Sequence, residues 1–334
     1  MWGQDIPTTD WDCKSRPRTG MSAEKGMLLG LPERWDEACF ALPAVRALEN
    51  SGLVGGLVLR EEQAEFWKTV SGLPQVVFSE KSGVRKLAGE LSGKWEASLV
   101  WEDGIAAQAF AKAKIAKRLG PEKPVPGKLL THPLDVAEGS AEHRVQLYLK
   151  TGERMGVAVD RPEFFAPADL GIPPEPGTVL LCPGSDFGAS HEWPLDRWQE
   201  LGEALRTAGR RITVAGVVGG RGLGKMLAER LGDGTKFFHA EPLAGALPLL
   251  AVHELTVAAD GSLPHLAAHA GSTCVTLFGP NDAVWKRPLG KRHKVVKRHV
   301  ECAPCLSAKC LLDGRCQTEL EVARVLAAIT SITL

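Results

Sequence analysis

The sequence predicts an α/β protein in which two domains with parallel sheets face each other across a cleft. Short apolar runs alternate with amphipathic stretches along both halves of the chain, and this order typically builds parallel strands joined by right-handed helical crossovers. A proline-rich segment separates the two series. The length of 334 residues is sufficient for two domains that each bury a core.

The charge balance excludes some classes of protein. The chain has 40 Lys and Arg against 40 Asp and Glu, which argues against a protein that binds nucleic acid or membrane surfaces through bulk positive charge. No window approaches the roughly 18 to 20 uninterrupted apolar residues of a membrane helix. The first residues, MWGQDIPTTDWDCKSRPRTG, lack the apolar core of a signal peptide. We therefore expect a cytoplasmic protein that binds no nucleic acid.

The N-terminal half predicts one sheet with its helices. Residues 1–20 are polar and aperiodic, and we expect a flexible extension there. Strands are predicted at MLLGL, LVGGLVL, PQVVF and ASLVW. Helices are predicted at DEACFALPAVRALENSG, EEQAEFWKTVSG, AAQAFAKAKIAKRLG and SAEHRVQLYLKTGERMG. Together they predict a first domain over residues 21–160.

The C-terminal half repeats the pattern after a break. Prolines interrupt both helix and strand in DRPEFFAPADLGIPPEPG, which predicts a linker over residues 161–176. Strands are then predicted at TVLLCPGS, RITVAGVV, LTVAAD and CVTLFGP, and helices at LDRWQELGEALRTAG, GKMLAERLG, LAGALPLLAVH and LPHLAAHAG. They predict a second domain over residues 177–334. Because ligands bind beyond the carboxyl ends of parallel strands, we expect the functional residues just after each strand.

A pair of carboxylates follows the first predicted strand. This strand ends at Leu31, and Asp36 and Glu37 stand at or near the start of the next helix. A carboxylate at this place would accept a proton from an attacking hydroxyl, as a general base does. Asp is also a preferred helix cap, and helix N-termini favour negative charge. The residues alone leave both interpretations open.

The loop after TVLLCPGS is a candidate phosphate site. Gly184, Ser185 and Gly188 precede a helix that begins near Pro194. Such a loop offers backbone N–H groups and a helix N-terminus to a phosphate. An ordinary turn between strand and helix explains the same residues equally well.

The stretch from LTVAAD to LFGP is the most informative one. Asp260 ends a predicted buried strand, and Ser262 precedes a helix that begins near Leu263. These groups would converge on a diphosphate and a sugar hydroxyl. His265 lies in the first turn of that helix, and is either a ligand contact or a histidine satisfied within the fold. Gly279 would let a ligand approach the backbone after the next strand.

A nucleoside triphosphatase is a rival interpretation. Residues from Gly219 to Lys225 match the phosphate-binding pattern G-x-x-x-x-G-K, but Met226 takes the place of the hydroxyl that should bind magnesium. Asp260 would be the second carboxylate for the metal. This interpretation predicts magnesium-dependent hydrolysis that Lys225→Ala abolishes.

Four cysteines form a compact cluster near the C-terminus. Cys302, Cys305, Cys310 and Cys316 have the spacing C-x2-C-x4-C-x5-C. Four thiolates this close would hold a structural zinc ion tetrahedrally. Reduced thiols and a redox-dependent disulfide are the alternatives.

A basic segment lies just before the cysteines. Seven Lys or Arg residues fall between Lys286 and Arg298. They would face an anionic acceptor or nucleotide phosphates, or they form an ordinary solvated face.

Taken in order, several segments resemble the bacterial heptosyltransferase family, glycosyltransferase family 9. These segments are PGSDFGASHEWPLDRWQEL, AADGSLPHLAAHAGSTCVTLFGPND, ECAPCLSAKC and RCQTELEVARVL. The resemblance extends from about Gly26 to the C-terminus. It implies the GT-B fold, in which two Rossmann-like domains face each other, and transfer of heptose from ADP-heptose to the lipopolysaccharide inner core.

The resemblance also implies roles for single residues. Asp36, in WDEACFALPAVRAL, matches the general base that would deprotonate the acceptor hydroxyl, so that attack inverts the anomeric carbon. The family segment D-[ST]-G-x-x-H matches Asp260, Ser262, Leu263 and His265, with Gly261 and Ser262 in inverted order, and implies contact with the ADP-sugar. His191 stands before Glu192 and Trp-Pro, where the family often has a phosphate-binding Lys or Arg. Trp35 replaces a family glycine.

The implied catalysis needs no cofactor, because a helix N-terminus would stabilise the leaving diphosphate without a divalent metal. The Asp-x-Asp sequence typical of metal-dependent folds occurs only at Asp10 to Asp12. The implied partners are ADP-heptose and an anionic glycolipid or oligosaccharide acceptor, with peripheral contact at the inner face of the cytoplasmic membrane. A catalytically inactive scaffold that only binds the donor is the alternative.

Overall fold

The computed structural model describes residues 26–332 except 82, 138, 140, 218, 219 and 221. The predicted extension over residues 1–20, which includes the Asp10 to Asp12 sequence, lies outside the described residues. Gly219 of the rival phosphate-binding pattern lies outside them as well.

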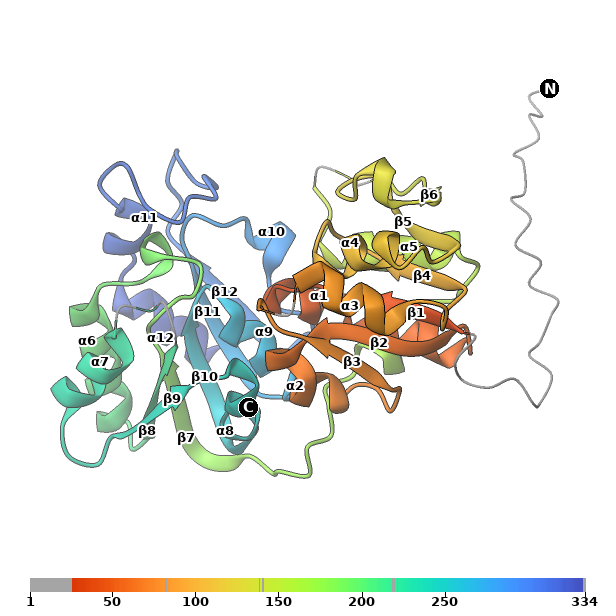
Figure 1. Cartoon of the computed structure of the whole chain (residues 1–334). Coiled ribbons are helices and arrows are strands. Elements are labelled where there is room, and N and C mark those ends of the chain that lie inside the picture. Colours follow the sequence, from red (N-terminus) through yellow and green to blue (C-terminus); the bar gives the residue numbers. More distant parts are fainter. Residues whose placement is uncertain are drawn as a thin grey trace, which may run out of the picture.

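The first half of the chain forms a parallel sheet with the strand order β3-β2-β1-β4-β5-β6. Its strands are β1 (Met27–Gly30), β2 (Val54–Arg60), β3 (Gln75–Phe78), β4 (Ala97–Val100), β5 (Lys117–Pro121) and β6 (His132–Leu134). Its helices are α1 (Trp35–Asn50), α2 (Ala64–Lys68), α3 (Gly83–Leu91), α4 (Ile105–Lys112) and α5 (Val145–Arg154). This half lies at the right of Figure 1.

The second half forms a second parallel sheet, with the order β12-β11-β10-β7-β8-β9. Its strands are β7 (Glu175–Cys182), β8 (Arg211–Val217), β9 (Lys236–Ala240), β10 (His253–Ala259), β11 (Thr273–Phe278) and β12 (His293–Lys297). Its helices are α6 (Leu195–Thr207), α7 (Leu223–Leu231), α8 (Leu247–Val252), α9 (Ser262–His269), α10 (Ala283–Lys286), α11 (Arg315–Thr318) and α12 (Val322–Thr330). Read from β9, this order repeats that of the first sheet, and both are the doubly wound order of Rossmann-like domains.

Adjacent residues of the strands enter different cores, which explains why the strands read as continuous apolar runs. Leu28 packs into a cluster on the outer face of the first sheet, whereas Leu29 enters a cluster on its inner face. Val179 and Leu180 divide in the same way in the second sheet. Strands that are buried on both faces are typical of parallel sheets covered by helices. The predicted α/β class with two parallel-sheet halves is confirmed.

The two inner faces share one apolar cluster. This cluster contains Leu29 and Phe40 from the first half and Leu180 and Leu266 from the second. The helices α1 and α9 pack against each other in it. The contact between the halves is therefore part of the core, and the carboxyl ends of β1, β7 and β10 lie next to it.

The structure corrects one predicted helix and adds elements that the sequence pattern did not reveal. The helix predicted over AAQAFAKAKIAKRLG ends at Lys112, because Lys114 takes a positive φ of 55°, and residues 117–121 form β5. Strands β6, β9 and β12 are all at sheet edges, where the apolar signal is weak; four of the five residues of β9 are exposed. Helices α3 and α12 were also not predicted.

The predicted domain boundaries stay predictions, although the last residues of the predicted linker, from Glu175, already belong to β7. No helix within the described part of the chain is both long and apolar enough to cross a membrane.

Candidate active site

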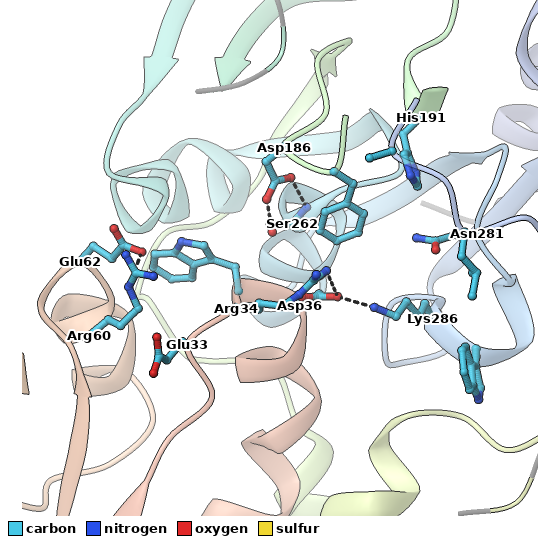
Figure 2. Close-up of a pocket in the computed structure, with 15 residues that line it drawn as sticks. Glu33, Arg34, Asp36, Arg60, Glu62, Asp186, His191, Ser262, Asn281 and Lys286 are labelled. Atoms are coloured by element: carbon cyan, nitrogen blue, oxygen red, sulfur yellow. Dashed lines mark hydrogen bonds and ion pairs between the residues drawn. The ribbon is translucent and has the colours of Figure 1, made fainter. Parts of the chain in front are cut away.

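A cavity of about 540 Å³ opens between the carboxyl ends of the two sheets. Loops from both halves line it, as Figure 2 shows. From the first half come Glu33, Arg34, Trp35, Asp36, Arg60 and Glu62, and from the second half Asp186, Phe187, His191, Ser262, Asn281, Trp285, Lys286, Leu306 and Ala308.

Asp36 is the buried carboxylate of this cavity. It is the second residue of α1 and its side chain is fully buried. Arg34 Nε donates to Oδ1 at 3.0 Å and Arg34 Nη2 donates to Oδ2 at 3.1 Å. Lys286 Nζ reaches Oδ2 from the other half of the molecule at 2.9 Å. Two cations, one from each half, therefore hold Asp36 (Figure 2).

These cations decide the protonation state of Asp36. Burial alone would raise the pKa of the carboxyl, but Lys286 and Arg34 outweigh burial and hold the pKa well below its ordinary value. The side chain is a carboxylate at neutral pH. Its position does not depend on helix capping, because Arg34 is the N-cap residue of α1 and no side chain caps this helix end.

The position of Lys286 is fixed by contacts between the halves. Its Nζ lies 3.8 Å from Glu37 Oε1, and Glu37 in turn accepts hydrogen bonds from Tyr148 at 2.6 Å and Arg144 at 3.1 Å. The backbone N–H of Arg144 also donates to the carbonyl oxygen of Trp285 at 3.0 Å. The sequence placed Lys286 only within a basic segment, and its pairing with Asp36 was not predicted.

Asp260 holds several residues of the second half together. Its Oδ2 lies 2.9 Å from His191 Nδ1 and accepts from Asn281 Nδ2 at 2.8 Å. Ser185 Oγ donates to the carbonyl oxygen of Asp260 at 2.6 Å. Burial raises the pKa of Asp260, and the contact with His191 opposes this rise. Asp260 therefore organises the cavity wall, to which His191 and Asn281 belong.

The N-terminus of α9 points into the cavity, as predicted, but a carboxylate of the protein already occupies it. The backbone N–H of Ser262 donates to Asp186 Oδ1 at 2.8 Å, and Ser262 Oγ donates to Asp186 Oδ2 at 2.6 Å. A Cβ atom on Gly261 would lie 2.8 Å from Asp186 Oδ1. Gly261 thus makes room for this carboxylate, a contact that the sequence did not reveal.

Other predicted ligand residues lie behind the cavity wall. Leu263 belongs to the shared apolar cluster. His265 is buried with its ring centroid 4.8 Å from that of Phe40, and burial lowers its pKa to about 3. It is therefore neutral at pH 7.

Two predicted glycines contact protein rather than the cavity. A Cβ atom on Gly184 would lie 2.9 Å from Gly220 Cα, so this residue allows two loops to meet. A Cβ atom on Gly279 would collide with the side-chain amide of Gln317. The close approach predicted for Gly279 is thus filled by a side chain of the protein itself.

The basic segment is divided between different places. Lys286 lines the cavity. Lys291 and Arg292 precede β12, and Arg292 Nη2 donates at 2.9 Å to the carbonyl oxygen of Gly271, which precedes β11. They stand before the amino end of β12 and do not line the cavity, so their contact with an anionic acceptor or with nucleotide phosphates stays a prediction beside the solvated face.

Lys225 and Asp260, two described residues of the rival triphosphatase, have different surroundings. Lys225 is exposed on α7, 3.9 Å from Glu229, and does not line the cavity. Asp260 is engaged by His191 and Asn281 instead.

The cysteine cluster lies in the segment between β12 and α12. The thiols of Cys302 and Cys305 are exposed, that of Cys310 is half-buried and that of Cys316 is buried, and none forms a disulfide. Burial, and then the other three thiols, raise the pKa of Cys316. Within the described residues, no three His, Cys, Asp or Glu side chains are arranged to hold a metal ion.

Comparison with known protein families gives a match over most of the second half. The model of glycosyltransferase family 9 (heptosyltransferase) matches residues 133–315, more than half of the 334 residues. The chain is also 30% identical over 151 residues to a lipopolysaccharide heptosyltransferase 1 of Pseudomonas aeruginosa. That alignment covers 44% of this chain and 40% of the relative, so it spans less than half of the relative's length.

Solved structures resemble almost the whole chain. The E. coli ADP-heptose lipopolysaccharide heptosyltransferase II has a TM-score of 0.73 at 16% identity, covering 92% of this chain and 98% of that chain. The E. coli heptosyltransferase WaaC with ADP has a TM-score of 0.72 at 17% identity, with 92% and 99% covered. The iron-containing dodecameric glycosyltransferase TibC of E. coli has a TM-score of 0.55 at 12% identity, with 91% and 77% covered. These likenesses confirm the predicted GT-B fold.

Proposed function

Because this chain belongs to glycosyltransferase family 9, we propose that it is an inverting glycosyltransferase that moves a heptose from ADP-heptose to a lipopolysaccharide core or a related glycolipid. The observation that supports this proposal best is the buried Asp36 carboxylate in the wall of a cavity that also contains the N-terminus of α9. A base and an anion-binding group thus share one cavity.

The proposed reaction is a single displacement. Asp36 takes the proton of the acceptor hydroxyl, whose oxygen forms a bond to the anomeric carbon of the donor. The bond from this carbon to the diphosphate breaks on the opposite side, and its electron pair stays on the departing phosphate oxygen. Lys286 and the N–H groups at the start of α9 would stabilise this developing charge. We therefore propose that catalysis requires no divalent metal.

The relatives suggest the partners. The donor expected from the names of the two E. coli heptosyltransferases is an ADP-sugar, and the acceptor expected from the Pseudomonas relative is lipopolysaccharide. An acceptor of this kind would place the protein at the cytoplasmic face of the inner membrane. The cavity wall of the first half contains Glu33 and Glu62 besides Arg34 and Arg60, so an acceptor would meet charges of both signs there.

Nucleotide binding is the first test of the proposal. The purified full-length protein is titrated by calorimetry with ADP, ADP-heptose, UDP, GDP and ATP, each with and without magnesium. We expect ADP and ADP-heptose to bind best, equally well with and without the metal. Preference for UDP or GDP would indicate a glycosyltransferase with a different donor nucleotide. Magnesium-dependent binding of ATP alone would support the triphosphatase. No binding of any nucleotide would contradict the donor site altogether.

A structural zinc ion at the four cysteines remains a prediction. The thiols are close enough to influence the pKa of Cys316, but they would have to rearrange to surround a metal. We expect about one zinc ion per chain in protein purified under reducing conditions, as for a four-thiolate site. Metal analysis checks zinc together with iron, and the Cys302→Ser and Cys305→Ser double variant, which removes two thiols, should lose the metal. Metal-free wild-type protein would contradict the zinc site and leave reduced thiols or a redox-dependent disulfide as the alternatives.

A further inference from the structure

One loop of the second half contacts the N-terminus of α9 and the cations Arg34 and Lys286, which line the same cavity as the proposed donor site. It runs over residues 185–188, between β7 and the short 3-10 helix that begins at Ala189. Asp186 accepts hydrogen bonds from both the backbone N–H and the hydroxyl of Ser262. The ring of Phe187 lies 5.1 Å from the guanidinium carbon of Arg34 and 5.8 Å from Lys286 Nζ. Figure 2 shows Asp186 turned toward Ser262 at the upper wall of the cavity.

Contacts with neighbouring backbone and side chains fix the position of this loop. Gly188 has a φ of 116°, a conformation that favours glycine, and a Cβ atom there would collide with the carbonyl oxygen of Ala308. Ser185 Oγ accepts from the N–H of Phe187 at 3.0 Å and donates to the carbonyl oxygen of Asp260. Gly261 leaves the space that the Asp186 carboxylate fills. Specific contacts on both sides of Asp186 therefore hold it at α9.

The N-terminus of α9 attracts anions, and a carboxylate and a phosphate compete for the same N–H groups. We propose that Asp186 is an internal anion that occupies the diphosphate subsite of the empty enzyme, and that the donor diphosphate displaces it on binding. This inference rests on the proposed function, in which the diphosphate binds at α9. It makes Asp186 a residue that sets donor affinity.

A displaced Asp186 carboxylate has a cation close by. Arg34 lies against Phe187, the next residue of the loop. Burial lowers the pKa of Arg34, but its acidic neighbours together, Asp36 first and Asp186 among them, hold this pKa above its ordinary value. Asp186 can thus leave Ser262 without losing all favourable electrostatic contact. The donor diphosphate carries more negative charge than the Asp186 carboxylate, so it should bind the N–H groups at the start of α9 more strongly.

A simple capping role for Asp186 makes a different prediction. The N-cap residue of α9 is Gly261, which has no side chain to cap the helix. If Asp186 only caps α9, its loss should weaken the fold and leave donor affinity equal or lower. If Asp186 competes with the donor, removal of its charge should strengthen binding of the diphosphate.

The test is the Asp186→Asn variant of the full chain. Asparagine caps helices about as well as aspartate, so the substitution removes the charge while its Oδ1 can still accept from the Ser262 N–H and its Nδ2 can donate to Ser262 Oγ. We expect ADP and inorganic pyrophosphate to bind about fivefold more tightly than to wild type, the size of the effect of a negative charge at a helix N-terminus. Adenosine, which has no phosphate, should bind unchanged. Calorimetry at constant ionic strength measures all three dissociation constants.

The control variant is Asp196→Asn, which removes the same charge from the first turn of α6 and does not line the cavity. Its dissociation constants should equal those of wild type. Asp186→Ser, which also retains a capping group, repeats the test if the asparagine variant does not fold.

The outcomes separate this inference from the proposed function. Wild type that binds ADP together with an Asp186→Asn variant that binds it no more tightly would overturn the inference alone. An equal increase in affinity for adenosine would also overturn the inference, because the effect would then not depend on the diphosphate. If neither protein binds ADP or pyrophosphate, the proposed function fails together with the inference.

Discussion

Replacement of Asp36 by asparagine should lower kcat for heptose transfer about a thousandfold, within the range that a general base contributes. Asparagine has nearly the same shape but cannot accept the proton of the acceptor hydroxyl. Asp36 forms ion pairs with Arg34 and Lys286. Removal of its negative charge leaves these two cations available to the donor. The dissociation constant for ADP should therefore stay the same or fall. Steady-state kinetics with ADP-heptose and calorimetry with ADP measure the two quantities.

The Asp196→Asn variant is again the control, because Asp196 does not line the cavity. It should retain the wild-type kcat. If the Asp36→Asn variant has a kcat near that of wild type, Asp36 is not the general base. Asp36→Asn that loses activity together with ADP binding would instead indicate that Asp36 maintains the cavity.

Acidification should destabilise the protein through its buried histidines. Burial lowers the pKa of His269 to about 3, whereas the unfolded chain has the ordinary value of about 6.5. Between these values the unfolded state binds the proton and the folded state does not. Stability that is fully present above about pH 6.5 is therefore lost as the pH falls toward 3. For His269 the loss between pH 7 and pH 5 should be about 2 kcal/mol.

The His269→Gln variant isolates this contribution. Unfolding in urea is measured for wild type and variant at pH 7 and pH 5, and wild type should lose about 2 kcal/mol more than the variant. Glu102 acts in the opposite direction, because burial raises its pKa to about 7, but it is present in both proteins and cancels. His269 contacts Thr69 across the two halves at 2.7 Å, so the variant is expected to be weaker at pH 7. Equal pH dependence in both proteins would contradict the prediction.

The sequence predicted those parts of the fold and site that depend on buried strands. Asp36, His191 and Ser262 line the cavity because each lies in a loop, or at the helix start, after a continuous apolar strand. Such strands have a clear pattern, and the carboxyl ends of parallel strands meet at one edge. The short exposed strands β6, β9 and β12 lack this pattern, and they were missed for that reason.

The missing parts of the site depend on contacts between distant segments. Asp186 and Ser262 are separated by 76 positions, and Lys286 lies 250 positions from Asp36. The sequence contains seven cations in the basic segment, and no local pattern distinguishes Lys286 from Lys291. Their difference arises because α10 lies at the carboxyl end of the sheet and Lys291 precedes β12. The family resemblance could not supply these contacts, because they depend on how the two halves meet.

The apolar cluster between the sheets has a consequence for motion and folding. Since Phe40 and Leu266 belong to one close-packed cluster, neither half can turn away without exposing apolar surface or sliding over its neighbour. The two halves should therefore unfold in a single cooperative transition, and their relative movement should be a small shear rather than a wide hinge opening. Exchange of substrate and product would then depend mainly on the loops at the rim of the cleft.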